Sequence, residues 1–281
     1  MESKTILITG CSTGIGLDLA ESLNEKGFQI FATARKESDV EKLKQLGLRA
    51  LQLDVADSES IRTATNTVLQ ESNGKLYALI NNAGFGQAGA VEDLKRDVLR
   101  EQFETNLFGL VELTNTLLPV MHQQGYGRII QISSVLGFVA MPFRGAYIAS
   151  KFALEGISDT LRLELKDTNI HISLIEPGPI TSRFRQNSLA LFNRNIDSEN
   201  SRFHTQYKAT LSRLETEGPA VPFTLEPEAV TNKVLTALTS TRPKPRYFVT
   251  FPTYLFAYLK RILPTTVLDK LLSRSSKIEG K

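Results

Sequence analysis

The chain has 281 residues, of which 41% are hydrophobic and 22% are charged, and its formal net charge is +3. This composition is typical of a globular protein and excludes a collagenous, a disordered or a highly charged chain. A charge of +3 spread over this length does not indicate a nucleic-acid partner. Cys11 is the only cysteine, which excludes an intramolecular disulfide and a cysteine-based zinc site.

The beginning of the chain, MESKTILITG, leads at once into an apolar strand, and no apolar run approaches the roughly 20 residues of a membrane-spanning helix. We therefore expect a soluble, cytoplasmic protein in a reducing compartment. His122, His171 and His204 are scattered and lack the spacing of metal ligands, so no metal site is predicted.

Short apolar runs alternate with longer amphipathic segments along the chain. The expected strands are 5–9, 29–34, 50–53, 76–80, 128–133, 170–176 and 246–250. The expected helices are 14–26, 40–46, 58–71, 97–123, 146–166 and 227–239. Apolar strands separated by helices indicate a parallel sheet covered on both faces. With right-handed crossovers, residues 1–281 are predicted to form a single doubly wound, Rossmann-type α/β domain.

The regular pattern stops over residues 178–225, where Phe184, Phe192 and Phe203 lie among polar residues. This segment follows the end of an expected strand, at the edge where doubly wound sheets bind ligands. Long loops inside compact domains are usually functional. We therefore expect a substrate loop or lid here.

A glycine-rich turn follows the first expected strand and opens the first helix. Its glycines, Gly10, Gly14 and Gly16, would let backbone N–H groups approach a pyrophosphate at the helix N-terminus, where the helix dipole favours anions. An ordinary strand-to-helix turn is the alternative, but the place of this turn after the first strand favours a dinucleotide site. The expected contacts in this turn are Gly10, Ser12, Thr13, Gly14, Ile15 and Gly16.

The second expected strand is followed by Arg35 and Lys36, and residues 30–36 contain no Asp or Glu. An acidic residue here would bind the ribose hydroxyls of NAD, whereas a basic one accommodates the extra phosphate of NADP. We therefore predict that NADP(H) is preferred over NAD(H). The alternative is that both residues are solvated surface cations.

Tyr147 and Lys151 lie four residues apart at the start of an expected helix, so their side chains share one face. A free phenol has a pKa of about 10, and we expect the Lys151 ammonium and an oxidised nicotinamide to lower that pKa towards neutrality. Ser134, at the end of an expected strand, could hydrogen-bond a substrate oxygen. Such Tyr–Lys pairs also arise by chance, but the coincidence with Ser134 and the glycine turn favours a reactive site.

Taken together, these motifs resemble the short-chain dehydrogenase/reductase family over almost the whole chain. The family's Thr-Gly-x-x-x-Gly-x-Gly turn is matched at residues 9–16, its Asn-Asn-Ala-Gly motif at 81–84 and its adenine-contacting pair at Asp54 and Val55. The resemblance implies that Tyr147 is the general acid/base and that Lys151 lowers its pKa and binds the nicotinamide ribose. It also implies that Ser134 orients the carbonyl or alcohol and that Asn106 holds a proton-relay water.

The resemblance also implies a set of cofactor contacts beyond the glycine turn. The family has a Pro-Gly pair followed by a Thr that contacts the nicotinamide carboxamide. Here Ser182 stands at the usual Thr position, and Thr181 precedes it, so which hydroxyl makes this contact is left open. The further expected contacts are Arg35, Lys36, Asp54, Val55, Asn82, Ala83, Gly84, Tyr147, Lys151, Pro177, Gly178, Ile180 and Ser182.

Residues 147–156, 175–179 and the tail from Arg246 are similar to the hydroxysteroid and retinol dehydrogenase-like branch of that family. This similarity implies an NADP(H)-dependent oxidoreductase that interconverts an apolar alcohol and its ketone or aldehyde. The family resemblance also implies a homo-oligomer, either a dimer or a tetramer. A non-catalytic NADP(H)-sensing protein of the same fold is the alternative.

Residues 242–281 combine aromatic and aliphatic residues with a local excess of Lys and Arg. We expect a last strand and helices that cover the substrate cleft or form an interface. The alternative is an amphipathic segment that lies on a membrane surface.

Overall fold

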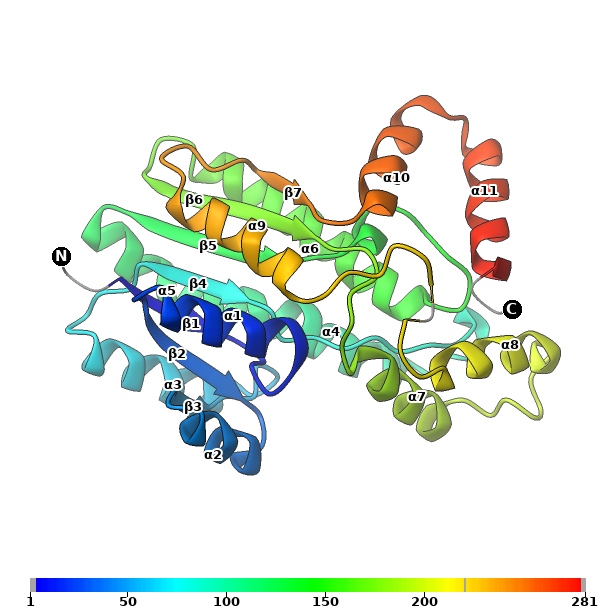
Figure 1. Ribbon diagram of the computed structural model, residues 1–281, viewed down its shortest axis with the longest axis horizontal. Helices are drawn as coiled ribbons and strands as arrows, with labels where there is room; N and C mark the ends of the chain where they lie inside the picture. Colours follow the sequence, from blue (N-terminus) through cyan, green and yellow to red (C-terminus); the bar gives the residue numbers. More distant parts are fainter. Residues whose placement is uncertain (1–3, 220, 279–281) are drawn as a thin grey trace.

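The computed structural model describes residues 4–219 and 221–278. Its strands form one parallel sheet of seven strands in the order β3-β2-β1-β4-β5-β6-β7 (Figure 1). The order reverses between β1 and β4, which is the topology of a doubly wound sheet. The predicted Rossmann-type α/β fold is therefore confirmed. The strands are β1 (Thr5–Ile8), β2 (Gln29–Ala34), β3 (Arg49–Gln52), β4 (Ala78–Asn81), β5 (Gly127–Ile132), β6 (Ile170–Glu176) and β7 (Arg246–Phe248).

Helices cover both faces of the sheet. On one face lie α1 (Gly14–Glu25), α2 (Glu37–Gln45) and α9 (Glu228–Thr239), and on the other lie α3 (Ser58–Glu71), α5 (Gly109–Gln124) and α6 (Gly145–Glu164). Alternate strand residues feed the two cores: in β1, Ile6 and Ile8 pack into the first layer and Leu7 into the second. Both faces of the sheet are therefore buried, which is why its strands are apolar throughout.

The expected helix 97–123 is interrupted in the structure. It begins as α4 (Arg96–Phe103), widens into the π-helical segment η2 (Glu104–Phe108) and continues as α5. A π-helical segment accommodates an extra residue within an α-helix and is frequent at functional sites. Asn106 lies within it, so the interruption coincides with an expected catalytic residue.

The segment 178–225, expected to be a substrate loop or lid, includes two helices that the sequence did not predict. It contains α7 (Phe184–Asn195) and α8 (His204–Glu215), beside the short helical turn η1 (Val91–Asp93). Phe192 of α7 packs edge-on against Tyr207 of α8, with their ring centroids 5.0 Å apart. The apolar positions of these helices pack against each other and against the loop after β4, and the many polar residues between them obscure the helical period. Figure 1 shows both helices beyond the carboxyl ends of the strands.

The chain ends in two helices, α10 (Phe251–Ile262) and α11 (Thr265–Ile278), which also lie beyond the carboxyl ends of the strands (Figure 1). Phe256 of α10 and Leu272 of α11 pack against Leu136 in the helical turn η3 (Val135–Gly137). Residue 220 of the segment 178–225 and residues 279–281 of the segment 242–281 lie outside the described residues, as do residues 1–3. Within the described part of the chain, no helix has the length and apolar character needed to cross a membrane.

Candidate active site

The glycine turn lies between β1 and α1 and is held in place from β4. Asn82 donates hydrogen bonds from Nδ2 to the carbonyl oxygens of Thr9 and Gly10, at 2.9 and 3.0 Å. Thr9 Oγ1 accepts hydrogen bonds from the backbone N–H groups of Asn82 and Ala83, at 3.0 and 2.9 Å. The expected motif at residues 81–84 is therefore a brace for the turn.

The turn has the close approaches that require glycine. Gly10 has a positive φ of 71°, and a Cβ atom there would lie 2.9 Å from Cα of Ala83. A Cβ on Gly16 would collide with the carbonyl oxygen of Gly10. Thr13, which precedes α1, makes no side-chain capping hydrogen bond within the described residues. A helix N-terminus without a side-chain cap retains backbone donors for an anion, so these residues fit a pyrophosphate.

Two further strand ends bring the expected adenosine-binding residues to the same edge of the sheet. Arg35 and Lys36 directly follow β2 and are exposed, and Gln52 at the end of β3 donates a hydrogen bond to the carbonyl oxygen of Arg35 at 3.0 Å. Asp54 follows β3, and its Oδ1 accepts a hydrogen bond from the backbone of Ala56 at 3.0 Å. Within residues 4–219 and 221–278, no ion pair is recorded for Arg35 or Lys36, so both cations are available to an anion.

Ser134, Tyr147 and Lys151 meet at the carboxyl end of β5. Ser134 is hydrogen-bonded to the Tyr147 hydroxyl and caps η3 by accepting a hydrogen bond from Leu136 N at 3.1 Å. Lys151 Nζ donates a hydrogen bond to the carbonyl oxygen of Ile132 at 2.7 Å and lies 5.8 Å from the centroid of the Tyr147 ring. The structure therefore brings together three of the four expected catalytic side chains.

Burial dominates the electrostatics of this group. It raises the pKa of Tyr147 to about 12, although the hydrogen bond from Ser134 favours the phenolate. Burial also lowers the pKa of Lys151 to about 8, partly opposed by the charge of Glu155. The expected lowering of the Tyr147 pKa by Lys151 is therefore not produced by the protein groups, because the ammonium is hydrogen-bonded to the backbone of β5 and the phenol is withdrawn from water.

Asn106 lies beside this group, but its side chain is committed to protein partners. Its Oδ1 accepts a hydrogen bond from Phe85 N at 3.0 Å, and its Nδ2 donates to Phe85 O at 2.9 Å and to Ser150 Oγ at 3.1 Å. Ser150 stands between Tyr147 and Lys151 on α6. The amide thus ties the π-helical segment to the loop after β4 and to α6.

Apolar side chains pack around the half-buried ring of Tyr147. Tyr147 and Ile148 pack against the cluster formed by η3, α10 and α11. Phe184, at the start of α7, lies edge-on to the Tyr147 ring at a centroid distance of 5.2 Å. Sequence analysis did not identify this role of Phe184, because α7 was not predicted and the aromatic spacing in this segment gave no local signal for the contact.

The structure distinguishes between the two hydroxyls that follow the sixth strand. Thr181 Oγ1 donates a hydrogen bond to Glu226 at 2.9 Å and is exposed. Ser182 lies against the glycine turn, since a Cβ on Gly14 would be 3.0 Å from Cβ of Ser182. Of the two, Ser182 is the better placed to contact a nucleotide held by that turn.

We expect Ser182→Ala to weaken cofactor binding by roughly 2- to 10-fold, the loss of one hydrogen bond. Thr181→Ala is the matched control and should change the cofactor dissociation constant by less than about twofold, because its hydroxyl is engaged with Glu226. Fluorescence titration of each variant with the reduced cofactor measures both values. A larger loss in Thr181→Ala would reverse the assignment.

Comparison with known proteins identifies the family. A model of the short chain dehydrogenase family matches residues 4–190. The uncharacterized oxidoreductase YbbO of Escherichia coli (strain K12) is 43% identical over 269 residues, covering 96% of this chain and 94% of its own. Human 17-beta-hydroxysteroid dehydrogenase type 1 is 35% identical over 263 residues, covering 89% of this chain and 78% of its own. Human retinol dehydrogenase 8 is 40% identical over 197 residues, covering 66% of this chain and 62% of its own.

Among solved structures, a short-chain dehydrogenase from Streptomyces avermitilis is 26% identical and superposes with a TM-score of 0.74, covering 93% of this chain and 94% of its own. The doubly wound fold agrees with these similarities. The chain therefore belongs to the short-chain dehydrogenase family and is an oxidoreductase, with hydroxysteroid and retinol dehydrogenases among its relatives.

Proposed function

We propose that the protein is an NADP(H)-dependent oxidoreductase that interconverts an apolar alcohol and its ketone or aldehyde, with Tyr147 as general acid/base. The observation that carries this proposal is the meeting of Ser134, Tyr147 and Lys151 at the carboxyl end of β5. The glycine turn lies at the same edge of the sheet, where ligands of doubly wound folds bind. The bound nucleotide and the general acid would thus lie at the same edge of the sheet.

A nicotinamide, when bound, supplies or accepts the hydride at its C4 atom. The glycine turn would hold the pyrophosphate, Asp54 and Val55 the adenine, and Ser182 the carboxamide. In the reducing direction, Ser134 donates a hydrogen bond to the carbonyl oxygen and Tyr147 transfers its hydroxyl proton to that oxygen as the alcohol forms. In the oxidising direction, Tyr147 takes the alcohol proton back.

The protonation state of the protein groups suits the reducing direction. With a pKa of about 12, the phenol of Tyr147 carries its proton at neutral pH, which is the form that a general acid needs. To act as a base, the phenolate needs a further positive charge, which an oxidised nicotinamide has. We propose that Lys151 assists through its ammonium charge and through the nicotinamide ribose. Because the Asn106 side chain is committed, we propose that its backbone holds the relay water.

The substrate class follows from the side chains around Tyr147. Phe184 lies edge-on to the Tyr147 ring, and Tyr147 and Met141 both pack against the cluster that contains Val139 of the loop after η3, Phe256 of α10 and Leu272 of α11. An apolar environment of this kind favours an apolar substrate over a charged or sugar-like one. We therefore propose that the segment 178–225 and the helices α10 and α11 enclose a lipophilic alcohol or carbonyl compound.

A cofactor-oxidation assay tests this function against the alternative of a nucleotide sensor. We expect the purified protein to oxidise NADPH, recorded at 340 nm, in the presence of apolar aldehydes and ketones. A matched panel of polar carbonyl compounds should give lower kcat/KM values. Tight NADPH binding without turnover on any of these substrates would favour the non-catalytic sensor.

We also propose that copies of the chain associate into a homo-oligomer. Phe108 and Ile157, on η2 and α6, are 50% and 39% exposed and lie on neighbouring helices of one face. Large apolar side chains exposed together on a helical face are typical of an interface. Light scattering of the purified protein measures its mass in solution, and a monomer would exclude this association.

A further inference from the structure

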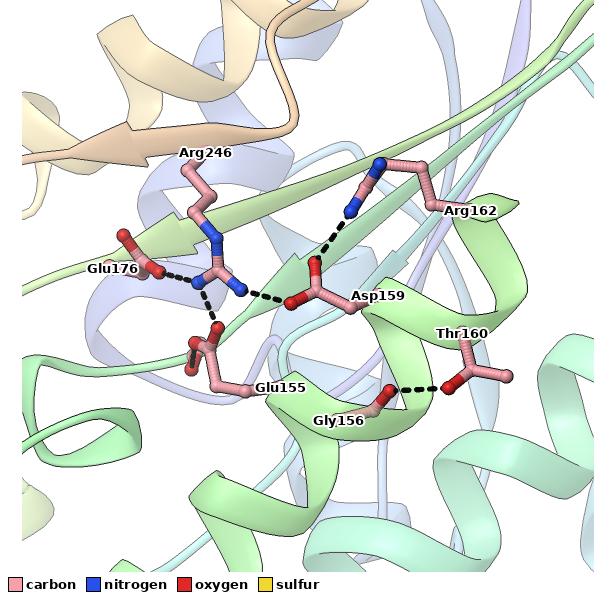
Figure 2. A network of polar contacts seen from close by, with 8 residues as sticks. Glu155, Gly156, Asp159, Thr160, Arg162, Glu176 and Arg246 are labelled. Carbon is pink, nitrogen blue, oxygen red and sulfur yellow. Dashed lines mark hydrogen bonds and ion pairs between the residues drawn. The ribbon is translucent and has the colours of Figure 1, made fainter. Parts of the chain in front are cut away.

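A cluster of charged side chains lies one helical turn beyond Lys151 on α6 (Figure 2). It consists of Glu155 and Asp159 on α6, Glu176 at the end of β6 and Arg246 at the start of β7. Glu155 and Glu176 are only 6% and 0% exposed. Arg246 forms ion pairs with all three carboxylates, including one with Asp159 at 2.6 Å. Buried charges are costly even when they are paired, so the cluster is not explained by stability alone.

Glu155 connects this cluster to the catalytic group. Glu155 lies four residues after Lys151 and eight after Tyr147, so the three side chains share one face of α6. Each of them is bonded to one of three consecutive residues at the end of β5. Tyr147 is bonded to Ser134, Lys151 to the Ile132 carbonyl and Glu155 Oε1 to the Ser133 hydroxyl. Hydrogen bonds of Tyr147, Lys151 and Glu155 thus connect one face of α6 to the end of β5 and the two residues that follow it.

The backbone after Ser134 is shaped around this carboxylate. A Cβ atom on Gly137, in η3, would lie 2.9 Å from Oε1 of Glu155 and 2.7 Å from Oγ of Ser133. The turn that positions Ser134 therefore packs directly against Glu155. A displaced carboxylate would disturb the residues that hold the substrate oxygen.

The ion pair with Arg246 and the hydrogen bond from the Ser133 hydroxyl favour the ionised form of Glu155. Burial raises its pKa, but the Ser133 hydroxyl and the Arg246 guanidinium oppose this shift. Burial and the charge of Glu155 together raise the pKa of Glu176 to about 8. At neutral pH, a pKa of about 8 favours the protonated form of Glu176. Burial lowers the pKa of Lys260 on α10, a shift that the charge of Glu155 opposes.

We propose that Glu155 is a positioning residue for the proposed reaction: its carboxylate places a negative charge one helical turn from Lys151 and fixes the Ser133–Ser134 segment that follows β5. Lys151 donates to a backbone carbonyl, and the charge of Glu155, one helical turn further along α6, opposes the lowering of the Lys151 pKa by burial. Without this charge, burial would leave Lys151 more readily deprotonated near neutral pH. This inference rests on the proposed function, since the ammonium matters only if Lys151 serves Tyr147 and the cofactor.

The pH dependence of kcat/KM in Glu155→Gln tests the proposal. Glutamine keeps the shape and removes the charge, so the pKa of Lys151 should fall below its value of about 8. We expect the alkaline limb of the profile to move to lower pH by about one unit, which lowers activity roughly tenfold on that limb and about twofold or less near pH 6. Asp159→Asn is the matched control, because it removes another α6 carboxylate that pairs with Arg246 but lies further from Lys151, and its profile should follow that of the unmodified protein.

An unchanged alkaline limb in folded Glu155→Gln would overturn the proposal, as would an equal shift in Asp159→Asn. If Glu155→Gln fails to fold, Ser133→Ala provides the second test. Removing the hydroxyl that donates to Glu155 should raise the pKa of that carboxyl and shift the limb in the same direction by a smaller amount. Tyr147→Phe, measured in parallel, separates the two failures: activity in that variant would refute the proposed function itself.

Discussion

Replacement of Tyr147 by Phe is expected to lower kcat by roughly 10²- to 10⁴-fold, the contribution typical of a positioned general acid. The substitution removes only the hydroxyl, so the ring keeps its edge-on contact with Phe184. The glycine turn and Arg35 do not contact this hydroxyl, and the cofactor dissociation constant should change by less than about threefold. Steady-state kinetics and cofactor titration of the same preparation measure both quantities.

Tyr207→Phe is a matched control for this experiment. Tyr207 is also buried and hydrogen-bonded, donating to Asp93 and accepting from Ala90 N at 2.9 Å, but it lies between α8 and the loop after β4. We expect its loss to affect stability more than kcat. Turnover at the unmodified rate in Tyr147→Phe would show that another group moves the proton.

Arg35→Asp is expected to weaken NADP(H) binding by roughly 10- to 100-fold, the value of a charge-assisted contact to a phosphate, and to change NAD(H) binding by less than about threefold. Arg35 directly follows β2, is exposed and has no recorded ion pair among residues 4–219 and 221–278, so its charge is available to a 2′-phosphate. Aspartate would instead favour ribose hydroxyls. Titrations with both reduced cofactors give the ratio of dissociation constants.

Lys26→Asp is the matched control. It makes the same exchange of a basic for an acidic residue at an exposed position, at the C-terminal end of α1 and away from the glycine turn. It should leave the NADP(H) to NAD(H) ratio unchanged, which separates a local phosphate contact from the overall charge of the protein. Equal losses for the two cofactors in Arg35→Asp would mean that the cation does not contact the phosphate.

Local sequence patterns predicted the strands, the glycine turn and the start of α6. The strands are apolar because both faces of the sheet are buried, and the glycines of residues 10–16 are needed for backbone conformation and close approach. The start of α6 was predicted with Tyr147 and Lys151 on one face. The helices α7 and α8 were not predicted, because their apolar positions pack against each other and against the loop after β4 rather than against the sheet.

The sequence by itself determined the doubly wound fold and the chemical groups of the site, because apolar periodicity, glycine spacing and the interval between Tyr147 and Lys151 act over short stretches of chain. Only the tertiary structure decided the protonation of those groups. Arg246 reaches Glu155 across 91 residues of sequence, and burial, which raises the pKa of Tyr147 and lowers that of Lys151, is a property of the packed protein.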